Sequence, residues 1–211
     1  MRLFVAVQPP VEAVQELADA IAPVRELPGA ERLRWTGVES WHLTLAFLGE
    51  VPAERLPELE GVLTEAVEGH GAHRLRLSGA GRFGDKVFWA GVEGETWALR
   101  RLAEAVAGAA AGLLGEGDAF RFHPHLTLAR AGSAHGQRRA VRRHAVGELE
   151  GLEAALAEFR GVEWEAAEVH LMKSELDGGF AHYESVRSWP LAHWTRGAGG
   201  ASGRAAGPDR P

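Results

Sequence analysis

Apolar positions along this chain follow two spacings, one typical of strands and one typical of helices. Short apolar runs at residues 3–7 and 87–92 predict buried strands, and apolar side chains recur at helical spacing in the segments that follow, residues 11–25 and 94–114. Further strands are predicted at residues 33–35, 41–48, 73–77, 120–130, 162–164, 168–175 and 180–189, and further helices at residues 52–68 and 148–159. This mixture predicts an α+β fold.

The order of these elements repeats. A strand, a helix and the tetrapeptide His-Leu-Thr-Leu occur twice, with the tetrapeptide at residues 42–45 and again at 125–128. Phe4 and Phe88 are 84 residues apart, and His42 and His125 are 83 residues apart. We therefore predict two similar lobes related by a pseudo-two-fold axis, with the motif strands facing each other. The alternative is that two strand–helix pairs arose by chance.

Each tetrapeptide divides its side chains between two faces if it is extended. Successive side chains of a strand point to opposite sides, so the histidine and threonine share one face and the two leucines share the other. The leucines can enter a core while the polar pair lines a cleft. A single histidine in a strand is usually structural. Because the motif occurs twice, we expect His42 and His125 to lie close together as a pair.

Paired histidines suit acid/base chemistry. Imidazole has an unperturbed pKa of roughly 6.5, so one ring can accept a proton while the other donates one. Thr44 and Thr127 stand two residues after their histidines, where a hydroxyl can bond a non-bridging oxygen of the same phosphate. The competing interpretation is that both pairs are only structural.

Beyond the tetrapeptides the two copies diverge. Phe47 stands five positions after His42, and Arg130 stands five positions after His125. In an ideal strand both would point away from the histidine face, but a bend after Thr127 would bring Arg130 to the cleft rim, where it could bind a phosphate or stack on a base. The alternative is a surface arginine at a strand end.

The strand of the second tetrapeptide carries two histidines on one face, His123 and His125, which is compatible with metal binding. No Asp or Glu stands in either motif to complete a site, so no metal is expected, and His123 is interpreted either as structural or as a support for a neighbouring site residue. The remaining histidines are expected at the surface or in packing, and Trp35, Trp41, Trp89, Trp97 and Trp164 in the core. Arg138, Arg139, Arg142 and Arg143 form a basic cluster that could guide an RNA strand or simply be a solvated helix face.

Composition narrows the class of protein. The 211 residues include no Cys, which excludes disulfides and thiolate nucleophiles, and the net charge of −6 argues against a protein that grips long nucleic acid through many phosphates. No apolar run approaches membrane-spanning length, and the N-terminus lacks a signal-peptide cleavage site, so a cytoplasmic location is expected. A phosphate-binding glycine loop and a serine-hydrolase elbow are both absent from the sequence.

The paired motifs resemble the 2H phosphoesterase superfamily. Within it, the sequences RLFVAV at residues 2–7, LRW at 33–35, HLTLAFLG at 42–49 and FHPHLTLAR at 122–130 are similar to the bacterial RNA 2′,3′-cyclic phosphodiesterases, also called 2′-5′ RNA ligases. The resemblance implies a duplicated, bilobal α+β fold over residues 1–194, with antiparallel sheets facing a central cleft and helices outside. Residues 195–211 are predicted to be a disordered tail.

The resemblance also implies an activity. It is the hydrolysis of a terminal RNA 2′,3′-cyclic phosphate to a 2′-phosphomonoester without a metal or other cofactor, with reversible 2′-5′ ligation by the same chemistry. His125 would deprotonate water, His42 would protonate the departing 3′-oxygen, and Thr44 and Thr127 would hold the non-bridging oxygens. Arg130 and Phe4 would contact the substrate.

RNA 3′ ends or small cyclic nucleotides are the expected substrates of a monomeric enzyme without membrane contact. The alternatives are a phosphodiesterase for another cyclic phosphate, such as ADP-ribose 1″,2″-cyclic phosphate, and a non-catalytic module that binds an RNA end or nucleotide.

Overall fold

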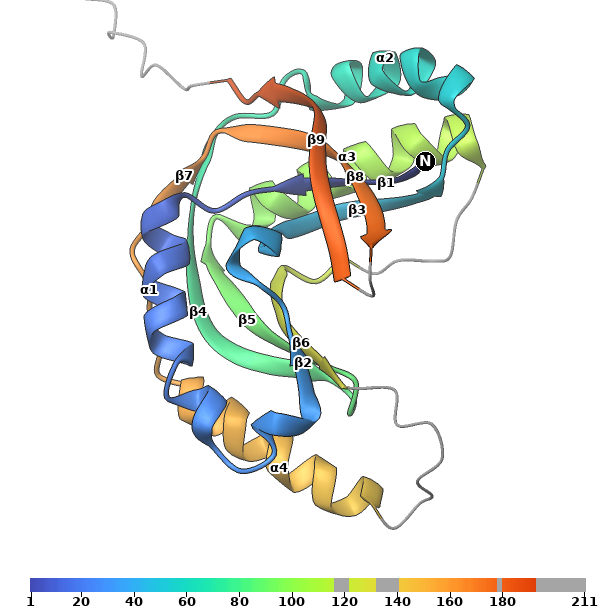
Figure 1. Ribbon diagram of the computed structural model, residues 1–211. Coiled ribbons are helices and arrows are strands. Elements are labelled where there is room, and N and C mark those ends of the chain that lie inside the picture. Colours follow the sequence, from blue (N-terminus) through green and yellow to red (C-terminus); the bar gives the residue numbers. More distant parts are fainter. Residues whose placement is uncertain (116–121, 132–140, 178–179, 193–211) are drawn as a thin grey trace, which may run out of the picture.

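The computed structural model describes residues 1–115, 122–131, 141–177 and 180–192. Four α-helices are interspersed among the strands of the described residues (Figure 1). The strands are β1 (Arg2–Val7), β2 (Leu33–Trp35), β3 (Leu43–Glu50), β4 (His73–Phe83), β5 (Val87–Gly94), β6 (His125–Ala131), β7 (Trp164–Ala166), β8 (Glu168–Asp177) and β9 (Phe180–Pro190). The α-helices are α1 (Val11–Ile21), α2 (Leu56–Val67), α3 (Thr96–Leu114) and α4 (Val141–Leu156). Short 3₁₀ turns cover Val24–Glu26, Ala30–Arg32, Val38–Ser40 and Ala53–Arg55.

The nine strands form one antiparallel sheet with the order β7-β4-β5-β6-β3-β1-β8-β9, and β2 pairs with β6 outside this path. The predicted α+β fold with antiparallel pairing is therefore confirmed. Between β3 and β6 the two halves of the sheet are joined through a single residue pair, Leu43 opposite Leu126. These leucines occupy the same position of the two tetrapeptides, so antiparallel pairing relates the two motifs by a local two-fold.

The helices are exchanged between the halves. Helix α1 follows β1 but packs against β4, in the other half, and α3 follows β5 but packs against β3. Figure 1 shows α1 and α4 at one end of the molecule and α2 and α3 at the other.

The leucines of both tetrapeptides enter the core, as their alternation predicts. Leu43, Leu45, Leu126 and Leu128 are at most 1% exposed. The expectation that the tryptophans are core residues is wrong for Trp97, which is 62% exposed near the start of α3. Leu99 and Leu102 lie on the face of α3 that packs on the core, whereas Trp97 lies on the exposed face of its first turn.

Most element boundaries lie close to the predicted ones, but several differ by four residues or more: the strand predicted from residue 120 begins at His125, and the helix predicted from residue 52 begins at Leu56. The helix predicted over residues 11–25 ends at Ile21, two residues before Pro23, which lacks a backbone donor. Strand β4, predicted to end at Leu77, continues to Phe83 through an irregular register. Helix α4 begins at Val141, earlier than predicted. The tail 195–211, the Gly178-Gly179 turn, Arg138 and Arg139 lie outside the described residues.

Candidate active site

The two tetrapeptides meet in one pocket of about 580 Å³. It opens where β3 and β6 meet, and β1, β2, β8 and β9 contribute the rest of its wall; we call it the cleft. Its lining includes every site residue that the sequence predicted: Phe4, His42, Thr44, His125, Thr127 and Arg130. The structure thus brings together side chains that are far apart in the chain.

Both histidines are held in the same way. Nδ1 of His42 lies 2.7 Å from the carbonyl oxygen of Ser40, and Nδ1 of His125 lies 2.7 Å from the carbonyl oxygen of His123. A carbonyl can only accept, so each Nδ1 carries hydrogen and donates. In a neutral ring Nε2 is then the basic nitrogen, and it is the atom left to meet a ligand in the cleft.

Burial lowers the pKa of both rings. For His42 the pKa falls to about 4, mainly through desolvation, with repulsion from His125 and Arg130 added and the Ser40 carbonyl opposing. The pKa of His125 is also lowered, again mainly by desolvation, with repulsion from His123 and Arg130. Without an anion in the cleft, both imidazoles are neutral near pH 7. Each is then able to accept a proton.

The threonines share the histidine face. Thr44 is 8% exposed and lies opposite Ala6 of β1, whereas Thr127 is half-buried and lies opposite Trp89 of β5. Because each threonine is two residues after its histidine, its hydroxyl projects from the same side of the strand. Two hydroxyl donors and two imidazoles therefore line one wall of the cleft.

A β-bulge explains how Arg130 reaches the cleft. In the β5–β6 ladder Phe88 pairs with Ala129, but the next residue, Trp89, pairs with Thr127, so Leu128 is an extra residue in β6. Leu128 and Ala129 are both fully buried, and the alternation of faces is reversed beyond them. Arg130 consequently lies on the histidine face, whereas in an ideal strand it would point to the opposite face.

The other motif has the equivalent bulge. Val5 pairs with Ala46 and Ala6 with Thr44, so Leu45 is the extra residue of β3. Leu45 and Ala46 are both buried, and Phe47 lines the cleft at 61% exposure. The sequence carried a signal for both bulges that periodicity alone misses: each tetrapeptide ends in Leu and is followed by Ala, two apolar residues in succession.

Thr36 fixes the bulge of β6 from the end of β2. Its backbone N–H donates to the carbonyl of Leu128 at 2.9 Å, and its hydroxyl lies 2.9 and 3.0 Å from the carbonyls of Leu128 and Thr127. The same hydroxyl accepts the indole N–H of Trp41 at 3.0 Å. Thr36 was not a predicted site residue, because its role depends on a strand pairing that the sequence does not display.

Different aromatic rings enclose the two histidines. Phe4 and Tyr183 pack on His42, with ring centroids 4.7 and 5.1 Å away. Phe83 packs edge-on against His125 at 4.8 Å, and Trp89 lies 6.2 Å from it. Tyr183 arrives on the β8–β9 hairpin, and no pattern in residues 180–189 marked it as a cleft residue.

The charges of the cleft are of one sign. Arg2, Arg34 and Arg130 line it together with the two histidines, and no Asp or Glu is among its lining residues in the described part of the chain. The whole chain carries a net charge of −6, so this arrangement is local. Such a surface favours an anionic ligand.

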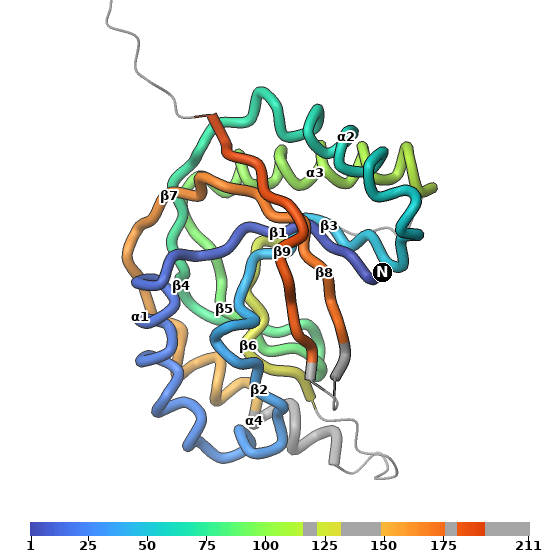
Figure 2. The backbone as a smooth tube through the Cα atoms, turned by 45° about the horizontal axis from the view of Figure 1, so that its top comes forward, coloured from blue at the N-terminus to red at the C-terminus, as the bar shows by residue number. Residues whose placement is uncertain are grey.

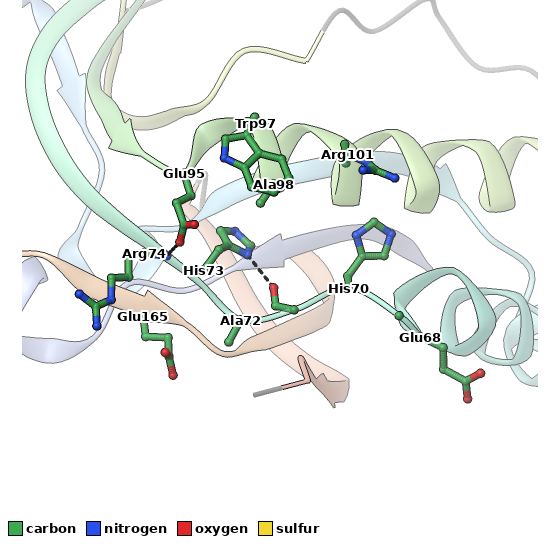
Figure 3. Close-up of a pocket in the computed structure, with 12 residues that line it drawn as sticks. Glu68, His70, Ala72, His73, Arg74, Glu95, Trp97, Ala98, Arg101 and Glu165 are labelled. Atoms are coloured by element: carbon green, nitrogen blue, oxygen red, sulfur yellow. Dashed lines mark hydrogen bonds between the residues drawn. The ribbon is translucent and has the colours of Figure 1, made fainter. Parts of the chain in front are cut away.

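A second, larger pocket of about 720 Å³ lies between the end of α2 and the start of α3 (Figure 3). It mixes Glu68, Glu95 and Glu165 with Arg74 and Arg101. Its buried histidine, His73, donates from Nδ1 to the Gly71 carbonyl at 3.0 Å. This pocket holds neither tetrapeptide and its charges are mixed. The smaller cleft is therefore the candidate active site.

Metal-ligating side chains do not cluster in the described ranges. Nowhere in them do three or more His, Cys, Asp or Glu side chains gather so that they could share a metal ion. None of the helices there is both long enough and apolar enough to cross a membrane.

Comparisons with known proteins agree on one family. The model of the 2′-5′ RNA ligase superfamily matches residues 6–178 of this chain. A curated protein of Thermus thermophilus named RNA 2′,3′-cyclic phosphodiesterase is 38% identical over 143 residues, which cover 62% of this chain and 68% of that protein.

Solved structures show the same likeness over a longer stretch. The crystal structure of TT0787 of Thermus thermophilus has a TM-score of 0.69 at 30% identity, and the match covers 90% of this chain and 98% of that one. E. coli LigT complexed with 3′-AMP also has a TM-score of 0.69, at 26% identity, covering 90% of this chain and 97% of LigT.

Proposed function

Since this chain belongs to the 2′-5′ RNA ligase superfamily, we propose that it is an RNA 2′,3′-cyclic phosphodiesterase, a metal-independent hydrolase that opens a terminal cyclic phosphate to a 2′-phosphomonoester. One observation carries the proposal: two identical His-x-Thr pairs, related by a local two-fold, line a single cleft together with arginines. That cleft offers what one phosphorus centre requires, namely two proton-transfer groups, hydroxyl donors and positive charge.

In the proposed reaction His125 acts as the base and His42 as the acid. Nε2 of His125 takes a proton from a water molecule, and the water oxygen forms a bond to phosphorus. The bond between phosphorus and the 3′-oxygen breaks, and Nε2–H of His42 gives its proton to that oxygen. The products are a 2′-phosphomonoester and a free 3′-hydroxyl, and each ring ends in the state from which the other began.

The aromatic surroundings support this assignment of roles. The departing 3′-oxygen remains attached to a nucleoside, so the acid must stand where the nucleoside binds. Phe4, Phe47 and Tyr183 offer apolar ring surface on the His42 side of the cleft. A sugar and base fit there, which leaves the His125 side for the attacking water.

Proton transfer by His42 requires a change in its pKa when substrate binds. Its pKa of about 4 in the empty cleft makes it neutral near pH 7. A phosphate anion between the rings opposes both desolvation and the repulsion from Arg130, and so raises that pKa. The expected rate profile is bell-shaped, with one limb for each histidine.

The threonines and Arg130 complete the proposed site. The hydroxyls of Thr44 and Thr127 donate to the non-bridging oxygens, where negative charge grows in the transition state. Arg130 adds a charged donor to the same oxygens. If a 5′-hydroxyl takes the place of water, the same steps join the two ends through a 2′-5′ diester.

The test is a direct assay with adenosine 2′,3′-cyclic phosphate and with an oligonucleotide that ends in one. We expect turnover that survives EDTA and a 2′-monophosphate product identified by phosphorus NMR. Loss of activity on chelation, or a 3′-phosphate product, would contradict the mechanism. Turnover of ADP-ribose 1″,2″-cyclic phosphate alone would favour the other cyclic-phosphate hydrolase, and binding without any turnover would favour a non-catalytic module.

We further propose a cytoplasmic monomer that acts on RNA 3′ ends or small cyclic nucleotides. The match to E. coli LigT complexed with 3′-AMP supports a nucleotide ligand. Sedimentation of the purified chain and fractionation of cells test the two remaining points.

A further inference from the structure

Two arginines oppose each other in the β2–β6 ladder, which runs beside the cleft. Arg34 of β2 pairs with Arg130 of β6, between the pairs Leu33–Ala131 and Trp35–Ala129. Residues directly opposite in an antiparallel ladder share a face and stand close together, so like charges at such a pair destabilise the sheet. Both side chains line the cleft, which confirms that they lie on its face.

Nothing in the described part of the chain neutralises this pair. Elsewhere the protein places carboxylates beside its arginines: Arg82 pairs with Glu150 and Glu153, and Arg187 with Glu60. Within the described ranges Arg34 and Arg130 have no ion pair or hydrogen bond from their guanidinium groups. Both side chains are exposed, so water and salt screen part of their repulsion, and an anion bound between them would relieve the rest.

The strand that carries Arg34 is firmly anchored, so the pair cannot separate easily. The indole N–H of Trp35 donates to the carbonyl of Ala30 at 3.0 Å, and its ring packs edge-on against Phe88 at 5.9 Å. Thr36 binds the carbonyl of Leu128 in the bulge. Figure 2 shows β2 running alongside β6.

The two arginines stand at different depths from the reacting groups. Arg130 is close enough to His42 and His125 to lower the pKa of each by charge repulsion. Arg34 is on the next strand, ~4.8 Å further along the hydrogen-bonding direction. A phosphate held by the two tetrapeptides would therefore contact Arg130. Arg34 is then available to bind a second anion beside that phosphate.

We infer that Arg34, together with Arg130, forms a second phosphate subsite that takes the internucleotide phosphate on the 5′ side of the terminal nucleotide. The preferred substrate is then an RNA chain with at least one diester, in preference to a lone nucleoside cyclic phosphate. The inference rests on the proposed function, because it assumes that the cyclic phosphate occupies the tetrapeptides.

Three substrates separate the sources of the second anion. They are adenosine 2′,3′-cyclic phosphate, its 5′-phosphorylated form, and the dinucleotide ApA ending in a 2′,3′-cyclic phosphate. The unaltered protein is expected to show a kcat/KM roughly tenfold or more higher for the dinucleotide than for the nucleoside, the effect of one charge-assisted hydrogen bond. A gain for the 5′-phosphorylated nucleoside with none for the dinucleotide would overturn the assignment to an RNA chain.

The variant Arg34→Gln tests the subsite itself. It should reduce the ratio of kcat/KM between dinucleotide and nucleoside towards one. The matched control is Arg32→Gln, which removes the same charge two residues earlier, where the side chain pairs with Glu31. The control should keep the ratio. An unchanged ratio in Arg34→Gln would refute the inference, whereas absence of turnover on all three substrates would refute the proposed function instead.

A stability measurement gives an independent readout. Without ligand, Arg34→Gln should raise the Tm, because it removes a like-charge pair. Inorganic phosphate should raise the Tm of the unaltered protein more than that of the variant, and so narrow the difference in Tm between them. A variant with a lower Tm than the parent would show that the two arginines do not repel each other, and the argument for an external anion would fail.

Discussion

The His42 side and the His125 side of the cleft share their chemistry and differ in what surrounds it. Both histidines donate from Nδ1 to the carbonyl two residues earlier, and both strands carry a bulge at the second leucine of the tetrapeptide. Past the bulge, one strand presents Phe47 and the other presents Arg130. The two His-Thr pairs are equivalent, and under the proposed function the residues just outside them decide which part of a substrate each side receives.

The walls extend this contrast. On the His42 side, the β8–β9 hairpin adds Tyr183 to Phe4 and so builds an apolar surface. On the His125 side, β2 adds Arg34 beside Arg130 and so builds a charged one. The cleft therefore has Phe4 and Tyr183 beside one histidine and the Arg34–Arg130 pair beside the other, although Arg2 of β1 also lines it and the two motifs at its centre are identical.

The largest expected effect tests whether both sides are needed. His42→Ala and His125→Ala should each reduce kcat by about 10³-fold, since each removes a proton-transfer group. A substrate with sulfur in place of the 3′-oxygen then separates the roles, because a thiolate leaves without a proton. It should restore most of the rate of His42→Ala and little of that of His125→Ala, measured by product release. The opposite pattern would exchange the roles of the two sides.

The threonines should show a smaller and unequal loss. Thr44→Val and Thr127→Val each remove one hydroxyl at nearly constant volume, and each should lower kcat by about 10²-fold with less change in KM. Thr44 is 8% exposed while Thr127 is half-buried, so water can replace the missing donor more easily at Thr127. The loss should therefore be larger for Thr44→Val. Equal losses would mean that water reaches both positions alike.

Thr36→Val tests the support of the His125 side alone. The substitution leaves the indole N–H of the buried Trp41 without its acceptor and removes the hydroxyl from the bulge carbonyls. The free energy of unfolding should fall by about 1–3 kcal/mol in a urea titration. Thr96→Val, outside the cleft, is the matched control and should change it much less. A loss of equal size in the control would show that the hydrogen bonds of Thr36 do not specifically stabilise the His125 side.

The smallest expected effect is a pH dependence of stability on the His42 side. The folded state holds the pKa of His42 at about 4, below the unfolded value of roughly 6.5, so the unfolded chain binds more protons between these values. The contribution of neutral, buried His42 to the free energy of unfolding is fully present above pH 6.5 and is lost as the pH falls towards 4. His42→Gln should lose less stability than the parent between pH 7 and pH 5, measured by thermal unfolding. His182→Gln, at an exposed position of β9, should behave like the parent.

Much of this site could be predicted from sequence because it depends on local alternation. The faces of His42, Thr44, His125 and Thr127 follow from strand periodicity, and the buried leucines confirm it. The position of Arg130 could not be decided in that way. A bulge depends on how two strands are registered, and the paired apolar residues Leu128 and Ala129 are only a hint of it.

Sequence periodicity could not predict which residues of distant strands would line the cleft. Tyr183 reaches His42 through a hairpin that begins more than a hundred residues later, and Arg34 meets Arg130 through a three-residue strand outside the main path of the sheet. Trp97 was misplaced because helical spacing identifies an apolar face without showing whether anything covers it. The candidate site residues of the tetrapeptides could be identified from local sequence, whereas the residues that surround them depend on how distant strands pair.

The single ladder pair between Leu43 and Leu126 has a mechanical consequence. Between β3 and β6, beside the two imidazoles, few backbone hydrogen bonds join the halves, and the three residue pairs of β2 with β6 join them further along β6. Helices α1 and α3 also link the halves, because α1 packs against β4 and α3 packs against β3. Substitutions on the buried faces of these helices, remote from the cleft, are therefore expected to change the distance between the two imidazoles.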